Sequence, residues 1–208
     1  LRTISIDVGG TFTDILSVDE KGVIQSFKLP TVPPSAFALT LNSSLGQISN
    51  QDELLYSTTV TLNSLLTGAL PHIGLIVTAG FRDILETARL PGSAGMAPSS
   101  RLPRRLVSLE WVREIQARLE ATGAERIGID RSEIEAFAHE YEAANIGVVA
   151  VSLLHSYLDP AHEQAVAAIF AAVAPGIKVV LSSTVLPELR EYERTLATAL
   201  NSCLIPAL

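Results

Sequence analysis

Residues 3–18 read TISIDVGGTFTDILSV, and this stretch decides the fold. Polar and apolar residues alternate on both sides of the glycine pair, as they do in strands with one buried face. Asp19–Gly22 is rich in turn-forming residues, and the alternation resumes over Val23–Leu29. The pattern therefore predicts three consecutive antiparallel strands, with Gly9 and Gly10 at the first bend.

Helical and strand signals alternate along the remainder of the chain. Apolar spacing predicts helices over residues 35–48 and 59–66. The later elements are expected in this order: strand 73–78, helical turn 81–87, loop 91–103, strands within 106–129 around a turn at 121–123, helix from Asp130, strand 148–154, helix from Asp159 and Pro160, strand 177–182, and helix from Glu188. Strands that alternate with helices form βαβ crossovers, so the predicted fold class is α/β.

Bulk composition disfavours several classes of protein. The 208 residues are 48% hydrophobic but only 5% aromatic, which favours layers of aliphatic side chains. The formal net charge is −7, and no run of Lys or Arg offers a surface for nucleic acid. Apolar stretches such as Gly147–Leu154 are far shorter than the roughly 20 residues that cross a bilayer. The single Cys203 fits a reducing compartment, so we expect a cytoplasmic protein without nucleic-acid or membrane partners.

The glycine bend is the strongest candidate for a phosphate site. Gly9 and Gly10 leave no side chain in the way, so successive backbone N–H groups can converge on an anion. Thr11 and Thr13 add hydroxyl donors. Asp7, on the polar face of the first strand, can hold Mg²⁺ through water, because that ion prefers oxygen ligands.

Two other phosphate-binding motifs do not fit this bend. A Walker loop needs Gly-Lys-Ser/Thr at the start of a helix, and a dinucleotide fingerprint needs three spaced glycines there. An ordinary hairpin turn remains the alternative. The Asp before the glycines and the Thr-x-Thr-Asp sequence after them favour phosphate binding.

Several stretches together resemble a known family. The bend resembles the first phosphate motif of the actin, Hsp70 and sugar-kinase superfold. More narrowly, the chain is similar to the hydantoinase A and 5-oxoprolinase family. The similar stretches span nearly the whole chain and include Thr58–Leu66, Thr78–Asp83, Leu154–Tyr157, Pro160–Glu163 and Leu186–Thr195.

The resemblance implies a ribonuclease H-like or actin-like ATPase lobe, with antiparallel N-terminal strands in a mixed sheet and a further βαβ portion. Residues 1–208 would form the N-terminal lobe, and a subdomain is expected around 85–180. A second lobe or a second subunit would supply the other phosphate motif and the adenosine pocket. We also expect the full-length protein to be an oligomer.

The resemblance further implies ATP-dependent opening of a cyclic amide of the hydantoin or 5-oxoproline type. In this interpretation Gly9, Gly10, Thr11 and Thr13 cradle the phosphates of ATP. Asp7 is assigned to Mg²⁺ and to catalysis. Phosphorylation of the amide oxygen would create a good leaving group, and catalysis would rest on positioning and charge neutralisation.

Four further residues complete the candidate site. Asp14 is expected to support the loop. Thr58, Thr59 and Asn63 lie at the start of an expected helix, where free N–H groups can meet an anion or a substrate carbonyl. They could equally serve as helix caps. The resemblance favours a functional role, with Asn63 assigned to catalysis.

Two other groups of charged or polar residues have simpler interpretations. His155 and His162 could form a metal pair, but no third ligand is apparent, which favours capping and packing. The alternating charges from Glu188 to Arg194 are typical of a solvated helix face, with a contact to another lobe or subunit as the alternative.

One departure from the family pattern leaves the activity open. Where the family usually has His-Gly before Thr-Thr-Val, this chain has Tyr56 and Ser57. An ATP-dependent ketone carboxylase subunit is therefore a second candidate. A nonenzymatic actin-like module, regulated by its nucleotide, is a third from a different class.

Overall fold

The computed structural model describes residues 1–32, 34–68, 70–87 and 106–207. Its contacts divide the chain into two compact units. The N-terminal unit comprises Leu1–Leu70 with Ala207, and the C-terminal unit comprises Pro71–Pro206. The expected loop at 91–103 lies outside the described residues. The subdomain expected around 85–180 stays a prediction.

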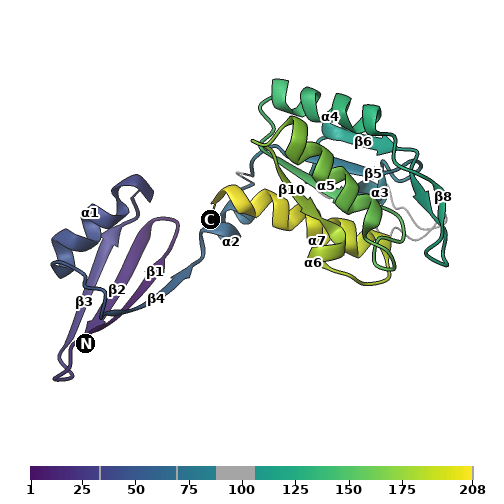
Figure 1. The fold of residues 1–208 in the computed structure, drawn as a ribbon. Coiled ribbons are helices and arrows are strands. Elements are labelled where there is room, and N and C mark those ends of the chain that lie inside the picture. Colours follow the sequence, from purple (N-terminus) through teal and green to yellow (C-terminus); the bar gives the residue numbers. More distant parts are fainter. Residues whose placement is uncertain (33, 69, 88–105, 208) are drawn as a thin grey trace, which may run out of the picture. The chain divides into compact units, whose positions relative to one another are not determined.

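Four strands form the sheet of the N-terminal unit, in the order β3-β2-β1-β4 (Figure 1). They are β1 (Thr3–Val8), β2 (Phe12–Val18), β3 (Ile24–Pro30) and β4 (Glu53–Thr58). The first three are consecutive and antiparallel, as predicted, whereas β4 runs parallel to β1. The sequence did not predict β4, because nearly all of its residues are exposed and show no alternation of burial.

Helix α1 (Pro34–Leu45) covers one face of this sheet. The helix ends before Gly46, whose φ of 72° is the left-handed conformation common after a helix. On the other face, Leu16 and Leu55 remain 43% and 52% exposed. The small core therefore lies between α1 and the sheet, and it is formed by Ile4, Ile6, Val8, Ile15, Leu41 and Leu45.

Arg2 ties the connection after α1 to the start of β1. Its guanidinium donates to the carbonyl oxygen of Leu45 at 2.8 Å and to the carboxylate of Asp52 at 3.0 Å. The backbone N–H of Ser49 and the Arg2 side chain hold the pKa of Asp52 below its usual value. These bonds fix the chain where it enters β4, beside β1.

Helix α2 (Val60–Thr67) follows β4 directly, close to the expected span of 59–66. It ends at Gly68, which has a φ of 69° and donates its N–H to the carbonyl oxygen of Leu65. The short connection places the N-terminus of α2 at the carboxyl end of β4.

The C-terminal unit is built on a fully parallel sheet in the order β10-β9-β5-β6. The strands are β5 (Gly74–Thr78), β6 (Val112–Ile115), β9 (Val148–Ser152) and β10 (Lys178–Leu181). Every residue of β5 and β9 is buried, as in parallel strands covered on both faces. The buried strands expected at 73–78 and 148–154 are thus confirmed.

Helices cover both faces of this sheet (Figure 1). Helices α4 (Arg131–Ala143) and α5 (Ala161–Val173) pack on the face that carries Ile76, Val149 and Val151. Helices α3 (Ile84–Thr87) and α7 (Glu191–Leu204) contact each other, and α7 packs on β9 from the opposite side. There the hydroxyl groups of Ser152 and Thr195 lie 2.7 Å apart.

Tyr141 of α4 is wholly buried at the centre of this core. Its hydroxyl donates to the carbonyl oxygen of Trp111 at 3.0 Å, and burial raises its pKa. A Cβ on Gly74 would lie 2.7 Å from the Tyr141 ring, so β5 must begin with glycine here. Asp130 caps α4 as predicted, because its carboxylate accepts the N–H of Ser132 at 2.9 Å.

Shorter elements complete the fold, namely η1 (Leu109–Trp111), the antiparallel pair β7 (Arg118–Leu119) and β8 (Glu125–Ile127), α6 (Ser182–Val185) and η2 (Ile205–Ala207). The fold is therefore mixed α/β, with antiparallel N-terminal strands in a mixed sheet and a separate βαβ portion, as expected. Within the described ranges, no helix is both long and apolar enough to cross a bilayer.

Candidate functional site

The bend between β1 and β2 is a tight hairpin with Gly10 and Thr11 at its tip. The N–H of Gly9 donates to the carbonyl oxygen of Phe12 at 2.9 Å and closes the turn. A Cβ on Gly9 would lie 2.8 Å from that same oxygen. Neither Gly9 nor Gly10 has a positive φ, so the bend needs glycine for close approach rather than for a left-handed backbone.

The N-terminus of α2 lies beside this hairpin tip. A Cβ on Gly10 would lie 2.9 Å from Nδ2 of Asn63, so the Asn63 amide rests on the bare glycine. The N–H of Thr59 donates to the carbonyl oxygen of Val8 at 3.0 Å, which fixes the start of α2 at the end of β1. Thr59 is the N-cap residue, but its side chain makes no capping bond. The first turn of α2 thus presents N–H groups that an anion can accept.

Thr13 lies on the buried side of the hairpin and is 3% exposed. Its hydroxyl is 3.1 Å from that of Thr31, which also donates to the carbonyl oxygen of Gly9 at 2.8 Å. The N–H of Thr31 reaches the carbonyl oxygen of Thr11 at 2.9 Å. Thr13 therefore supports the loop from within, whereas the exposed Thr11 keeps its side chain at the surface.

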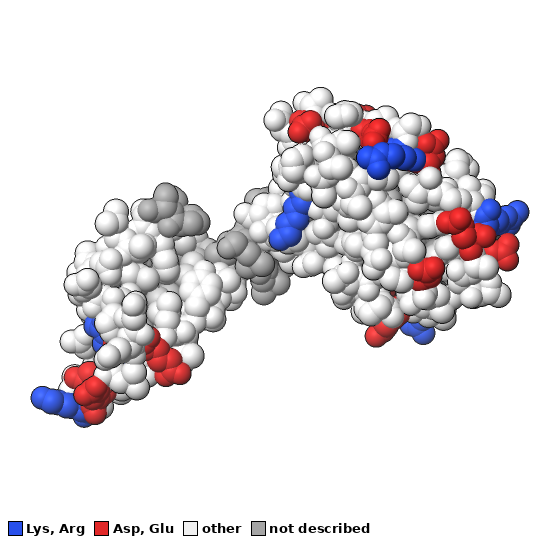
Figure 2. Space-filling model, viewed as in Figure 1, with Lys and Arg blue, Asp and Glu red and all other residues white. Residues whose placement is uncertain are grey.

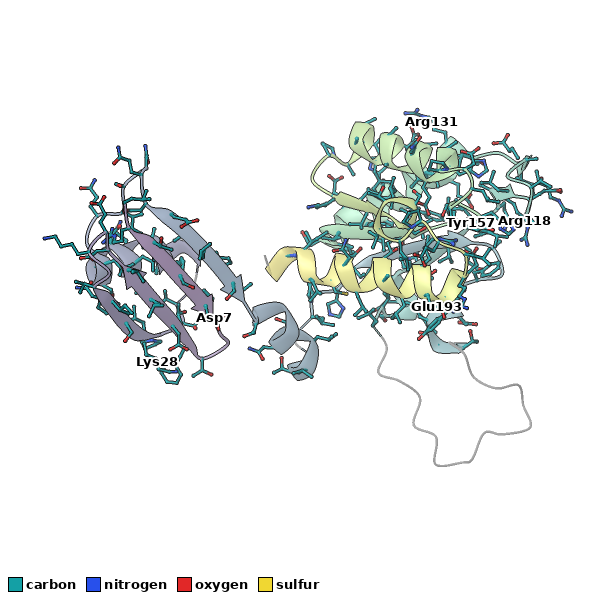
Figure 3. All side chains as sticks on the ribbon, turned by 90° about the horizontal axis from the view of Figure 1, so that it is seen from below. Asp7, Lys28, Arg118, Arg131, Tyr157 and Glu193 are labelled. Carbon is teal, nitrogen blue, oxygen red and sulfur yellow. The ribbon has the colours of Figure 1, made fainter. Side chains whose placement is uncertain are left out.

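Two carboxylates lie opposite each other on the exposed face of the sheet. Asp7 and Asp14 are cross-strand partners in the β1–β2 pair. Asp7 accepts the hydroxyl of Ser57 at 2.8 Å, and Asp14 pairs with the ammonium of Lys28 at 3.2 Å. Figure 3 marks Asp7 and Lys28 on this sheet. Asp7, Asp14 and Lys28 line a shallow pocket of about 430 Å³, and the carboxylate oxygens there are ligands suited to Mg²⁺.

Sequence and structure comparisons identify the family of the chain. The family model of the hydantoinase/oxoprolinase N-terminal region matches residues 3–174, which is most of the chain. The chain belongs to the hydantoinase/oxoprolinase family. The matched residues include the glycine hairpin between β1 and β2.

Named relatives of this family member are subunits of larger enzymes. The alpha subunit of caprolactamase from Pseudomonas jessenii is 31% identical over 99% of this chain and 31% of its own length. The gamma subunit of acetophenone carboxylase from Aromatoleum aromaticum is 28% identical over 98% of this chain and 31% of its own length. This chain therefore spans about a third of the length of these relatives.

Two solved structures share its fold. The crystal structure of ATP-dependent caprolactamase from Pseudomonas jessenii superimposes with a TM-score of 0.81 at 31% identity, over 99% of this chain and 32% of the other. The nucleotide-free structure of acetone carboxylase gives a TM-score of 0.79 at 27% identity, over 100% of this chain and 33% of the other. The two superpositions show that this chain shares the fold of both proteins, each of which is described as ATP-dependent.

The departure from the family pattern places two side chains on opposite faces of β4. Tyr56 faces α1, where its ring meets that of Phe37 edge-on at 6.4 Å. Ser57 faces the other way and holds Asp7. The next residue, Thr58, donates its hydroxyl to the carbonyl oxygen of Val8 at 2.9 Å. The serine therefore adds a contact to the carboxylate assigned to the metal.

Three residues of this arrangement were missed from the sequence. Thr31 fastens the loop, Ser57 holds Asp7, and Lys28 pairs with Asp14. Thr31 carries no local signal, because it lies between elements and acts on residues about 20 positions away. The alternation of β3 could have placed Lys28 on the exposed face, but the role of Ser57 depends on the register of β4.

His162 and the charged run near the C-terminus have structural roles. His162 is buried, and its Nε2 lies 2.6 Å from a carboxylate oxygen of Glu125. Among the described residues, no three His, Cys, Asp or Glu side chains converge on a common point. The prediction of a solvated face is wrong for Arg194, which is 0% exposed. On the surface seen in Figure 2, basic and acidic side chains are interspersed within the C-terminal unit.

Proposed function

We propose that the N-terminal unit binds the phosphate chain of ATP as part of an ATP-dependent cyclic-amide hydrolase. The observation that carries the proposal is the contact of Gly10 with Asn63 at the start of α2. It brings a side-chain-free hairpin and the N–H groups of a helix start to one place. That combination suits a polyanion. The family membership and the ATP-dependent relatives support the same assignment.

Each predicted residue has a distinct part in this proposal. Gly9 and Gly10 admit the phosphates, and Thr11 offers an exposed hydroxyl. Thr59 offers a hydroxyl at the start of α2 that makes no capping hydrogen bond. Asn63 can donate its amide to a phosphate or to the substrate carbonyl.

Other residues hold this constellation in place or address the metal. Thr13 and Thr58 bond within the unit and keep the loop and β4 in register. Asp7 and Asp14 provide facing carboxylates that fit Mg²⁺ through water. Bound there, Mg²⁺ would neutralise charge on the phosphates. Ser57 and Lys28 orient these two carboxylates.

ATP makes chemical sense for a cyclic amide. The amide carbonyl is a poor electrophile because nitrogen donates electrons into it. Transfer of the terminal phosphoryl group to the carbonyl oxygen releases ADP and creates a good leaving group. Water can then add to the carbon, and collapse of the adduct breaks the C–N bond, which opens the ring and leaves an acyl phosphate with a free amine. A second water hydrolyses the acyl phosphate to a carboxylate and inorganic phosphate. The residues of this chain contribute positioning and charge neutralisation.

A ketone carboxylase subunit is the second candidate. The similarity to acetophenone carboxylase and the fold shared with acetone carboxylase favour it. The same loop could serve phosphoryl transfer to a ketone-derived oxygen. The family usually has glycine at the position of Ser57, whose hydroxyl here contacts Asp7. This departure from the pattern is compatible with the carboxylase activity.

The complete activity requires more than these residues. We propose that a second lobe, or a partner subunit, supplies the adenosine pocket and the other phosphate motif. The relatives are about three times as long as this chain and are named as subunits, which supports a multi-part, oligomeric enzyme. A cytoplasmic location fits the use of ATP.

Turnover of the intact protein tests these assignments. ADP release would be measured with ATP and Mg²⁺ in the presence of caprolactam, hydantoin or 5-oxoproline, and separately with acetone or acetophenone plus bicarbonate. We expect a cyclic amide to stimulate ADP release. Stimulation by a ketone alone would select the carboxylase branch. ADP release that no substrate of either class changes would favour a nonenzymatic regulatory module and overturn the proposal.

A further inference from the structure

A second polar pocket lies in the C-terminal unit, which contains none of the residues assigned to nucleotide binding. It measures about 240 Å³ and is formed by the β7–β8 hairpin and the segment after β9. Its lining includes Arg118, Glu120, Arg126, Leu154 and His155. Arg118 and Tyr157 are marked in Figure 3 on the same unit.

The topology of the sheet explains why a crevice forms there. All four strands are parallel, so their carboxyl ends meet at one edge. After β5 the chain moves to β6 on one side, and after β9 it moves to β10 on the other. Such a switch point opens a crevice at the carboxyl ends of the strands, where α/β proteins bind ligands. Leu154, whose N–H donates to the Thr78 hydroxyl at 3.0 Å, crosses this point.

His155, the next residue, is held in an unusual conformation. Its φ is 61°, which is uncommon for a residue other than glycine. Arg190, before the start of α7, has a φ of 92°, and the N–H of His155 lies 3.5 Å from a carboxylate oxygen of Glu191. Strained residues cluster at functional sites. Nδ1 of His155 is also buried without a hydrogen-bond partner in the described part of the chain, which is rare for a buried polar atom.

The charges of the pocket indicate what it binds. The side chains of Arg118 and Arg126 make no hydrogen bond or ion pair with the described residues, unlike those of Arg113 and Arg131, which pair with glutamates. The lining of the pocket thus holds one acidic residue, Glu120, against two arginines with unpaired side chains and one histidine. A planar guanidinium with free donors matches the geometry of carboxylate and phosphate oxygens.

We propose that this pocket binds a small oxyanion, a carboxylate or a phosphate group, between Arg118, Arg126 and His155. Because the pocket lies wholly in the C-terminal unit, the proposal stands apart from the assignment of the glycine hairpin. An enzyme that transfers phosphate to a polar substrate would have use for such a site.

Titration of a protein that contains residues 1–208 tests the site directly. The ring resonances of the four histidines would be followed by NMR, at constant pH and ionic strength, while chloride is replaced by inorganic phosphate or, separately, by acetate. We expect saturable shifts of the His155 resonance, assigned with the variant His155→Gln, while His72 and His139 stay unchanged. The anion that binds with the higher affinity, phosphate or acetate, identifies the natural class of ligand.

Matched arginine variants complete the test. Arg118→Gln and Arg126→Gln should each weaken binding roughly tenfold, because each removes a charge-assisted bond. Arg131→Gln, which removes an equal charge from the surface of α4, should leave the affinity unchanged. The proposal would be overturned if the His155 resonance shifted linearly, without saturation, with both anions. It would also be overturned if all three arginine variants bound the anion with equal affinity. NMR spectra of each variant without added anion would verify that it is folded.

Discussion

The two sheets of this chain differ in how many of their faces are covered. In the C-terminal unit, β5 and β9 are buried along their whole length between two layers of helices. In the N-terminal unit, one helix covers one face, and β4 is almost entirely exposed. The well-packed unit can thus be stable by itself, whereas the thinner one leaves backbone and carboxylates accessible. Ligand-binding segments are commonly drawn from the less stable parts of a protein.

Buried polar groups sharpen this difference. In the C-terminal unit, the Glu163 carboxylate accepts the N–H of Leu153 at 3.0 Å and the hydroxyl of Ser182 at 2.6 Å. Arg194 donates to the same hydroxyl at 3.1 Å and to the carbonyl oxygen of Leu153 at 2.9 Å. This network joins α5, α6 and α7 to the end of β9. The same network connects the family-like stretches Pro160–Glu163 and Leu186–Thr195, because Glu163 and Arg194 both bond to the Ser182 hydroxyl. The connection between these stretches stabilises the fold.

The largest expected effect comes from Arg194→Met. The variant would remove the donor groups that Arg194 supplies to the carbonyl oxygens of Leu153 and Glu188 and to the carboxylate of Glu191. Breaking a buried charged network costs about 3–5 kcal/mol of unfolding free energy. Urea unfolding followed by the fluorescence of Trp111, the single tryptophan, reports this unit alone.

A matched control separates the network from the loss of a charge. Arg131 is 64% exposed and forms an i,i+4 pair with Glu135 on α4. Arg131→Met should change the unfolding free energy by no more than about 0.5 kcal/mol. Equal unfolding midpoints for the two variants would mean that the buried network does not stabilise the unit.

An intermediate effect is expected in the N-terminal unit, where two adjacent glycines should behave differently. In Gly9→Ala the new Cβ meets a backbone oxygen, that of Phe12, at 2.8 Å, so the hairpin must distort at a cost of about 1–3 kcal/mol. In Gly10→Ala the Cβ meets the end of the Asn63 side chain, which can move. Gly10→Ala should therefore retain stability and lose ATP affinity.

Amide hydrogen exchange of β1 and β2 measures the stability of this unit, and turnover of the intact protein measures ATP affinity. The double variant Gly10→Ala with Asn63→Ala removes the clash and should still bind ATP poorly, because the amide donor is gone. Equal loss of protection in the two single variants would show that Asn63 is packed too tightly to move.

The sequence predicted best what depends on local pattern. The alternation in residues 3–18 gave the first hairpin, and Asp130 marked the start of α4. Apolar runs marked β5 and β9, whose flanking helices follow from the βαβ order. In each case neighbouring residues carry the signal, so no distant contact needs to be known.

What the sequence missed depends on contacts between distant segments. β4 has no buried face, so no alternation marks it, and only its pairing with β1 reveals it. Arg194 lies in a run of alternating charges that resembles a solvated face, yet its bonds reach residues 12 and 41 positions away. Thr31 fastens the glycine hairpin from outside any strand or helix, so no local pattern marks it either.

The smallest expected effect concerns Ser57, which holds a carboxylate without burying it. In Ser57→Ala, Asp7 loses one hydrogen bond on an exposed face, so the stability of the N-terminal unit should change by less than about 0.5 kcal/mol. Asp7 becomes free to rotate, and we expect the Mg²⁺ concentration for half-maximal ATP turnover to rise by less than roughly tenfold. Ser26→Ala is the matched control, because Ser26 lines the same pocket without a hydrogen bond to the described residues. If both variants need the same Mg²⁺ as the parent, Ser57 does not position Asp7, and the metal assignment of this face loses its support.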